Sequence, residues 1–222
     1  AERGGYPHFM IKEIMEHPEA IAKTIAPRIS NGRIELGFKH ITAEMLKKVN
    51  SIKIIGCGSA YHVGFVAGYF MRAALRIPVE SVLASEFRYD DPIVDENTLA
   101  IVISQSGETL DTLYGLREAK KHGAKTIAIV NVVGSTIANE SEDVLYTWAG
   151  PEIAVATTKA YSTQLIAMYV LAVQFAKVRG RIDEEAYAGY IRELCSLPGK
   201  RKLESRSKLI CSVPAPSTRP CG

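Results

Sequence analysis

The chain alternates between short, unbroken runs of apolar residues and longer segments in which apolar residues return every three or four positions. The short runs predict strands that are buried on both faces, and the longer segments predict amphipathic helices. We expect five strands, at residues 52–58, 79–85, 99–104, 125–131 and 143–148. We expect helices at residues 41–49, 59–75, 109–123, 158–180 and 183–194. Thr42 is placed to cap the first of these helices and Gly123 to end the third.

The order of these elements predicts the fold class. Strands that alternate with helices are typical of an α/β protein, here a doubly wound, flavodoxin-like parallel sheet of about five strands. An amphipathic helical arm at residues 9–25, interrupted at Pro18, precedes the sheet. We therefore divide the chain into a helical arm (residues 1–50), a doubly wound domain (residues 51–195) and a tail (residues 196–222).

The helix expected at residues 158–180 is apolar on nearly all sides. A helix of this kind must be covered on more than one side. We expect a second copy of the chain to cover part of it, over residues 164–178, which predicts a homodimer.

The composition is that of a globular protein. The chain has 222 residues, 47% of them hydrophobic, which is enough for one substantial core. The longest apolar run, residues 165–173, is too short to span a membrane, and no secretory signal opens the chain. The four cysteines form no CxxC pair and no Cys/His spacing typical of zinc sites. We therefore expect a cytoplasmic protein without a bound metal.

The positive charge is concentrated in the tail. The chain carries 27 Lys/Arg and 24 Asp/Glu, a net charge of +3, but the residues from Lys200 onward hold six bases and one acid. The remainder has a net charge of −2 and no basic face suited to nucleic acid. The tail lacks a regular period and contains dipeptides that common cloning sites encode. We interpret it from about residue 201 as vector-derived or frame-shifted, and expect residues 196–222 to be disordered; a native disordered tail is the alternative.

Three polar clusters lie where strands give way to helices, at residues 56–60, 104–109 and 151–164. Ligands of doubly wound sheets bind at these carboxyl ends of the strands. The second cluster places three hydroxyl groups and a glycine at the start of a helix, whose free backbone N–H groups favour a phosphate. The alternative is that Ser106 or Thr109 only caps the helix. Three hydroxyl groups beside two further clusters favour the phosphate site.

Other residues of the clusters have two interpretations each. Residues 56–58 lack the third glycine and the lysine of nucleotide-binding motifs, so we expect no nucleotide cofactor. Lys159 would face a phosphate or extend to solvent, and Glu152 would orient a sugar hydroxyl or cap the following helix. Cys57 has no base placed by sequence to activate it, which favours a packed side chain over a nucleophile. We expect no catalytic residue in this chain.

Four segments carry a resemblance to a known family. GCGSAYHVG, SQSGETLDT and PEIAVATTKAYSTQL, preceded by YPHFMIKEIMEHPEAI, resemble the glutamine–fructose-6-phosphate aminotransferases, also called glucosamine-6-phosphate synthases. The resemblance covers residues 4–195 and is to the first of two sugar isomerase (SIS) domains in the isomerase half of these enzymes. Those enzymes transfer the amide nitrogen of glutamine to fructose 6-phosphate and isomerise the product to glucosamine 6-phosphate, for hexosamine biosynthesis.

The resemblance implies a set of residues that bind the sugar phosphate: Cys57, Gly58, Ser59, Ser104, Gln105, Ser106, Thr109, Val155 and Thr157. Two positions depart from the family pattern, since Ala60 stands where a serine is usual and Thr157 replaces a common serine. Loss of the hydroxyl group at residue 60 affects the expected orientation of the sugar more than that of the phosphate.

The resemblance also implies partner domains. Three parts of those enzymes have no counterpart in this sequence: the glutaminase domain with its cysteine nucleophile, and the second SIS domain and C-terminal segment that supply the isomerase acid, base and Schiff-base lysine. We expect a fragment that binds the sugar phosphate, needs no cofactor and is inactive alone. The alternatives are another SIS enzyme, such as a sugar-phosphate deglycase or isomerase, and a non-catalytic sugar-phosphate sensor. The absence of a helix-turn-helix segment speaks against the sensor.

Overall fold

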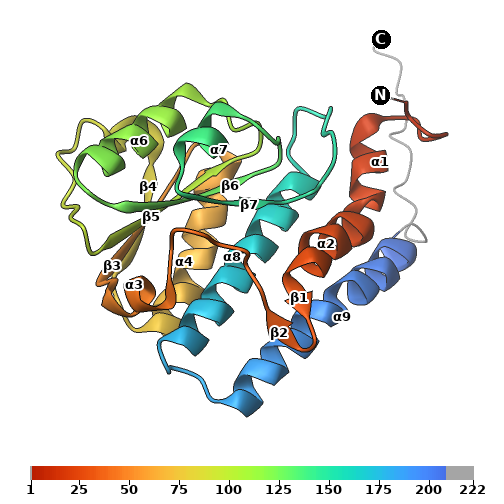
Figure 1. The fold of residues 1–222 in the computed structure, drawn as a ribbon. Coiled ribbons are helices and arrows are strands. Elements are labelled where there is room, and N and C mark those ends of the chain that lie inside the picture. The colour runs from red at the N-terminus through yellow and green to blue at the C-terminus, as the bar shows by residue number, and fades with distance from the viewer. Residues whose placement is uncertain (1, 209–222) are drawn as a thin grey trace, which may run out of the picture.

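The computed structural model describes the backbone of residues 2–208 and the side chains of residues 2–200. Its centre is a parallel sheet with the strand order β4-β3-β5-β6-β7 (Figure 1). These strands are β3 (Ser51–Gly56), β4 (Val79–Leu83), β5 (Thr98–Ser104), β6 (Lys125–Val130) and β7 (Asp143–Tyr146). The order is that of flavodoxin-like sheets, so the predicted fold class is confirmed.

The point at which the strand order reverses lies between β3 and β5. The chain passes from β3 to the edge strand β4 and then returns to the other side of β3 to form β5. Gly56 at the end of β3 pairs with Ile103 of β5, so the two strands end at the same level. This arrangement opens a crevice outside their carboxyl ends, where doubly wound sheets bind ligands.

Helices cover both faces of the sheet. One face packs against α3 (Ala43–Lys48), α4 (Ser59–Leu75) and α8 (Lys159–Val178) in a core that contains Ile101, Met71 and Leu171. The other face packs against α5 (Ala84–Phe87), α6 (Leu110–Lys121) and α7 (Thr136–Glu140), with Val102 and Leu116 in its core. The inner strands β5 and β6 are buried along nearly their whole length, which explains their apolar runs, while the edge strands β4 and β7 are partly exposed.

The N-terminal arm consists of α1 (Phe9–Met15) and α2 (His17–Ile25). The helix breaks at Glu16, and Pro18 occupies the first turn of α2, where its missing N–H group costs no hydrogen bond. A 3-10 turn η1 (Ala26–Arg28) and an antiparallel ribbon of β1 (Ile29–Ser30) and β2 (Arg33–Ile34) follow. Thr42 caps α3 as predicted, because its Oγ1 accepts a hydrogen bond from the Met45 N–H at 3.3 Å.

The arm packs on α8 and α9 (Glu184–Lys208) in a third core with Ile21, Val170 and Ile191. Figure 1 shows α1 and α2 in red beside the blue α9. Helix α8 is therefore enclosed by α2, α3, α4 and α9 of its own chain. This enclosure explains why α8 is apolar on nearly all sides, so the sequence argument for a second copy on this helix no longer holds.

Helix α9 extends beyond residue 195, where we placed the end of the domain. Residues 196–208, expected to be disordered, are helical in the structure, with Pro198 inside the helix. The residues after Gly199 are mostly Lys, Arg, Leu, Glu and Ser, of which the first four have high helix propensity even without an amphipathic pattern. Lys200 Nζ also donates to Glu193 Oε2 at 2.6 Å. The rest of the predicted disordered tail, residues 209–222, lies outside the described residues.

None of the helices within the described residues is both long enough and apolar enough to span a membrane.

Candidate functional site

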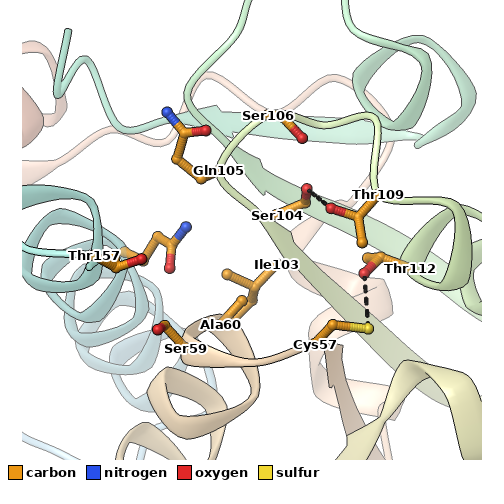
Figure 2. A pocket seen from close by; sticks show the side chains of 11 residues that line it. Cys57, Ser59, Ala60, Ile103, Ser104, Gln105, Ser106, Thr109, Thr112 and Thr157 are labelled. Atoms are coloured by element: carbon orange, nitrogen blue, oxygen red, sulfur yellow. Dashed lines mark hydrogen bonds between the residues drawn. The ribbon is translucent and has the colours of Figure 1, made fainter. Parts of the chain in front are cut away.

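A cavity of about 180 Å³ opens at the carboxyl ends of β3 and β5. It is bounded by the first turns of α4 and α6, by the loop before α8 and by Gln164 in the second turn of α8. Eleven residues line it: Cys57, Ser59, Ala60, Ile103, Ser104, Gln105, Ser106, Thr109, Thr112, Thr157 and Gln164. Figure 2 shows Ser59 and Thr157 on one side of this cavity and Ser104, Thr109 and Cys57 on the other. Segments about 100 residues apart in the sequence thus contribute to one polar site.

The structure brings most of the predicted binding residues together. Seven of the nine line the cavity: Cys57, Ser59, Ser104, Gln105, Ser106, Thr109 and Thr157. Gly58 is not among the lining residues; it has a φ of +53° and turns the chain from β3 into α4. Val155 is not among them either, because its side chain is fully exposed on the loop before α8.

The loop between β5 and α6 is organised by Ser104. Its buried Oγ accepts a hydrogen bond from the Gly107 N–H at 3.0 Å and lies 3.0 Å from Thr109 Oγ1. Ser106 Oγ accepts from the Glu108 N–H at 3.2 Å. Ser106 keeps its own hydroxyl proton for another acceptor, since a hydroxyl group can donate and accept at once.

Gly107 is required by this loop. Its φ is +69°, a conformation that glycine adopts without strain. A Cβ atom at this position would also lie 2.0 Å from Ser135 Oγ, well inside contact distance. The glycine therefore allows the loop to pack directly against the start of α7.

Glu108 points to α7. Its Oε1 and Oε2 accept hydrogen bonds from the Thr136 N–H at 2.8 Å and from Thr136 Oγ1 at 2.7 Å. The hydrogen bond from the Thr136 backbone, with that from its side chain, holds the pKa of Glu108 below its ordinary value. Glu108 is an ionised cap of a neighbouring helix, and the cavity lining does not include it.

The cavity is polar but contains no ionisable acid or base other than the Cys57 thiol. Its capacity to bind an anion comes from hydroxyl groups and from the first turns of α4 and α6. The N-cap residues of these helices, Gly58 and Thr109, form no side-chain capping hydrogen bond. Free N–H groups at helix starts attract phosphate. At α4 the N–H groups of Ala60 and Tyr61 already donate to the Cys57 carbonyl oxygen, so the start of α6 is the freer of the two.

Lys159 is not directed at the cavity, and it does not extend to solvent. Lys159 is 3% exposed, and its Nζ lies 2.6 Å from Oε2 of Glu16 on the arm. Glu152 caps α8, as one of its two interpretations predicted. Its Oε1 accepts from the N–H groups of Thr158 at 2.8 Å and Ala160 at 3.2 Å.

Cys57 contacts a hydroxyl group and no base. Thr112 Oγ1 donates to its Sγ at 3.8 Å, the second hydrogen bond drawn in Figure 2. Neither a histidine nor a carboxylate lies among the lining residues. This environment favours the role expected from the sequence, in which Cys57 is a packed side chain and not a nucleophile.

Gln164 is a lining residue that ends the third polar cluster of the sequence but was not among the predicted binding residues. It lies on α8, is 3% exposed, and its Oε1 has no hydrogen-bond partner within the described residues. A buried amide oxygen without a partner costs about 1–3 kcal/mol, so a group of this kind is expected to meet a donor. One signal was available: Gln164 is a polar residue in a helix that is otherwise nearly all apolar.

The described residues contain no group of three or more His, Cys, Asp or Glu side chains placed to hold a metal ion.

Comparison with known proteins agrees with the predicted resemblance. The chain is 56% identical over 201 residues to a glutamine–fructose-6-phosphate aminotransferase (isomerizing) of Clostridium tetani, and 52% identical over 212 residues to that of Clostridium acetobutylicum. These alignments cover 90% and 94% of this chain but 33% and 35% of the relatives. The chain thus spans about a third of the length of these relatives.

A solved structure extends this similarity to three dimensions. It is the C-terminal domain of glucosamine-fructose-6-phosphate aminotransferase from Francisella tularensis, with 38% identity and a TM-score of 0.87. The match covers 95% of this chain and 60% of that one. A family model described as the SIS domain matches residues 45–174, which contain the whole parallel sheet and all eleven residues that line the cavity. This match spans more than half of the chain, and the protein therefore belongs to the SIS-domain family.

Proposed function

We propose that this chain is the sugar-phosphate-binding SIS domain of a glutamine–fructose-6-phosphate aminotransferase, and that its cavity takes fructose 6-phosphate and glucosamine 6-phosphate. One observation carries the proposal: hydroxyl groups and the uncapped start of α6 line a polar cavity that has no charged side chain. A phosphate dianion suits this environment because backbone N–H groups and hydroxyl protons would neutralise it.

The phosphate would lie against the β5–α6 loop. Ser106 and Thr109 would donate hydroxyl protons to it, and Ser104 would hold the loop through its bond to the Gly107 N–H. The first turn of α4, with Ser59, would close the other side. Cys57, Gly58 and Gln105 belong to the same proposed contact set through the segments that they share with these residues.

The sugar would extend toward Thr157, on the loop before α8, and Gln164, in the second turn of α8. The free Oε1 of Gln164 would accept a hydrogen bond from a sugar hydroxyl. Val155, on the loop of Thr157, would reach a ligand only if that loop folds over the cavity.

We further propose that the chain needs its partner domains for catalysis. Isomerisation of a sugar needs a general base near the proton to be moved, and release of ammonia from glutamine needs an activated nucleophile. The cavity lining offers no carboxylate, histidine or lysine for the first task, and its cysteine contacts no base. A glutaminase domain and a second SIS domain would supply these groups. The one-third coverage of the relatives supports this proposal.

Sequence identity favours an aminotransferase over other SIS enzymes, since the aminotransferases are 56% and 52% identical to this chain. Residues 1–44 lie outside the SIS-domain match, but alignments with the aminotransferases cover 90% of the chain and must include part of the arm.

Titration calorimetry with fructose 6-phosphate tests the proposal. Wild-type chain should bind it, and Ser106→Ala should bind about tenfold or more weakly, because a hydrogen bond to a charged group contributes roughly 1.5–3 kcal/mol. Ser85→Ala is a matched control, since Ser85 lies outside the cavity and donates to Glu86. Failure of the wild-type chain to bind at millimolar concentration would contradict the proposal.

The homodimer and the cytoplasmic location remain predictions. The enclosure of α8 by its own chain removes the original reason for a second copy on that helix. Light scattering at micromolar concentration would determine the mass in solution. Free Cys57 and Cys195 support a reducing compartment for the described part of the chain.

A further inference from the structure

The loop that carries Thr157 depends on the N-terminal arm for its place. Within the described residues, two hydrogen bonds join residues 151–157 to an element other than the adjoining α8, and both end on Glu13 of α1. Glu13 Oε1 accepts from the Ile153 N–H at 2.6 Å and from the Ala154 N–H at 3.1 Å. In Figure 1 the teal loop between β7 and α8 rises beside the red α1.

The loop has little apolar anchorage of its own. Ile153 is 50% exposed and Val155 is fully exposed, so neither side chain buries much surface. The bond from Glu152 to the start of α8 lies within the loop and the adjoining helix, so it does not attach the loop to the arm. Glu13 therefore provides the polar attachment between the middle of the loop and α1.

A second contact ties the arm to the end of the same loop. Lys159, the first residue of α8, places its Nζ 2.6 Å from Glu16 Oε2, and Lys12 Nζ lies 3.4 Å from the other Glu16 oxygen. Two carboxylates of the arm, one turn apart, thus hold the loop at its middle and at its junction with α8.

The burial of Glu13 needs an explanation other than core stability. The residue is 2% exposed, and its Oε2 has no hydrogen-bond partner within the described residues. Removing a carboxylate from water costs several kcal/mol unless its partners compensate, so an apolar residue would fill this place at lower cost. The carboxylate of Glu13 instead fixes the positions of the Ile153 and Ala154 N–H groups through charge-assisted hydrogen bonds.

We propose that Glu13 is a positioning residue for the sugar site: it fixes the loop at residues 151–158 and so sets where Thr157 meets the ligand. This inference rests on the proposed function, since it assumes that the cavity holds a sugar phosphate. The arm lies outside the SIS-domain match at residues 45–174, yet it becomes part of the site. A displacement of α1 would be transmitted to the sugar end of the cavity and leave the phosphate end in place.

Two ligands separate this role from a general loss of structure. The loop of Thr157 faces the sugar, and the β5–α6 loop faces the phosphate. Glu13→Ala should weaken binding of fructose 6-phosphate by roughly fivefold, about the effect of one lost neutral hydrogen bond, and leave binding of inorganic phosphate within about twofold. Glu13→Gln retains an Oε1 acceptor and should restore most of the affinity. Glu19→Ala, an exposed arm residue paired with Lys23, should have no effect.

A double variant tests the route through Thr157. If Glu13 acts by placing Thr157, then Thr157→Ala should weaken binding much less in the Glu13→Ala chain than in the wild-type chain. Additive losses would overturn the proposal. So would an equal loss of affinity for fructose 6-phosphate and for inorganic phosphate in Glu13→Ala.

NMR of the unmodified chain keeps the test valid even if Glu13→Ala fails to fold. Fructose 6-phosphate should shift the amide resonances of Ile153 and Ala154 more than inorganic phosphate does. If fructose 6-phosphate binds but shifts these two resonances no more than inorganic phosphate does, the inference about Glu13 is overturned and the proposed function stands. A wild-type chain that binds no fructose 6-phosphate would instead overturn the proposed function, and this inference with it.

Discussion

Ser104 Oγ and Thr109 Oγ1 lie 3.0 Å apart across the turn between β5 and α6. Ser104 Oγ already accepts from the Gly107 N–H, so it has its own proton to give to Thr109. In that arrangement Thr109 keeps its proton for a ligand in the cavity. Under the proposed function, Ser104 would support the loop from within, while Thr109 and Ser106 would present protons to the ligand.

This relationship predicts different effects for two serines of one loop. Ser104→Ala leaves the Gly107 N–H without its acceptor, and should lower the free energy of unfolding by about 1–3 kcal/mol and also weaken phosphate binding. Ser106→Ala should weaken binding with less than about 0.5 kcal/mol loss of stability. Urea unfolding and calorimetry on both variants measure the two quantities. A Ser104→Ala chain as stable as wild type would contradict the supporting role.

The unpaired Oε1 of Gln164 predicts a variant that binds less but folds no worse. Gln164→Leu removes a buried oxygen that has no partner within the described residues, so the thermal midpoint of the free chain should be unchanged or higher. Affinity for fructose 6-phosphate should fall about threefold or more, with no change for inorganic phosphate. Thermal unfolding and calorimetry provide both measurements.

Gln174 on the same helix is the matched control for Gln164. Its Oε1 accepts from the Tyr187 hydroxyl at 2.7 Å, away from the cavity. Gln174→Leu should lower stability without changing affinity. If Gln164→Leu behaves in this way as well, Gln164 has no role in sugar binding.

The ion pair between Lys159 and Glu16 predicts a pH dependence. Burial opposes the ionisation of Glu16, but the hydrogen bond and charge of Lys159 outweigh it and hold the pKa of Glu16 below its ordinary 4.5. A carboxyl group with a lowered folded-state pKa stabilises the fold above its unfolded pKa, and this stability is lost as the pH falls through the folded pKa. Stability should therefore decrease as the pH falls below about 4.5.

Urea unfolding of wild type and Lys159→Met across this range measures the effect. The variant should lose roughly 1–3 kcal/mol at neutral pH, less than a fully buried pair, because the Glu16 side chain is 32% exposed. Its stability should fall less steeply than that of wild type between neutral pH and acid. Parallel curves for the two chains would show that Lys159 does not set the ionisation of Glu16.

The isolated chain should make no glucosamine 6-phosphate. Its cavity lacks a carboxylate or histidine to move a proton, and Lys159 is engaged with Glu16 outside the cavity. The assay supplies fructose 6-phosphate with glutamine, then with ammonia, and uses Lys159→Ala as the background. Formation of the amino sugar above that background would reveal a complete active site in this chain.

The regular elements of the fold were largely predictable from the sequence. Each strand lies within two residues of its predicted ends, because buried strands give unbroken apolar runs that end in polar residues. Helix α4 begins and ends where expected, at Ser59 and Leu75. The two-residue strands β1 and β2 and the short helices α5 and α7 were missed, since elements of this length contain too few residues to show a period.

The site was only partly predictable, for a physical reason. Ser104 and Cys57 follow apolar strands in the sequence, so their place at the carboxyl edge could be inferred from local pattern. The partner of Lys159 is Glu16, 143 residues away, and no local pattern identifies such a pair. Val155 was included through the family resemblance, but its side chain is exposed outside the cavity. Gln164 combined a polar type with an apolar helix, a signal that was present and not used.

The contacts of the arm also determine when the site can form during synthesis. Glu13 meets Ile153 across 140 residues of sequence, and Ile21 of α2 packs with Val170 of α8. Contacts of such high sequence separation form slowly, because a long loop of chain must close first. The ribosome makes the arm early, yet the arm reaches its native neighbours only after α8 has emerged. The sheet edge can be complete by then, so the attachment of Glu13 to Ile153 and Ala154 is among the last contacts to form.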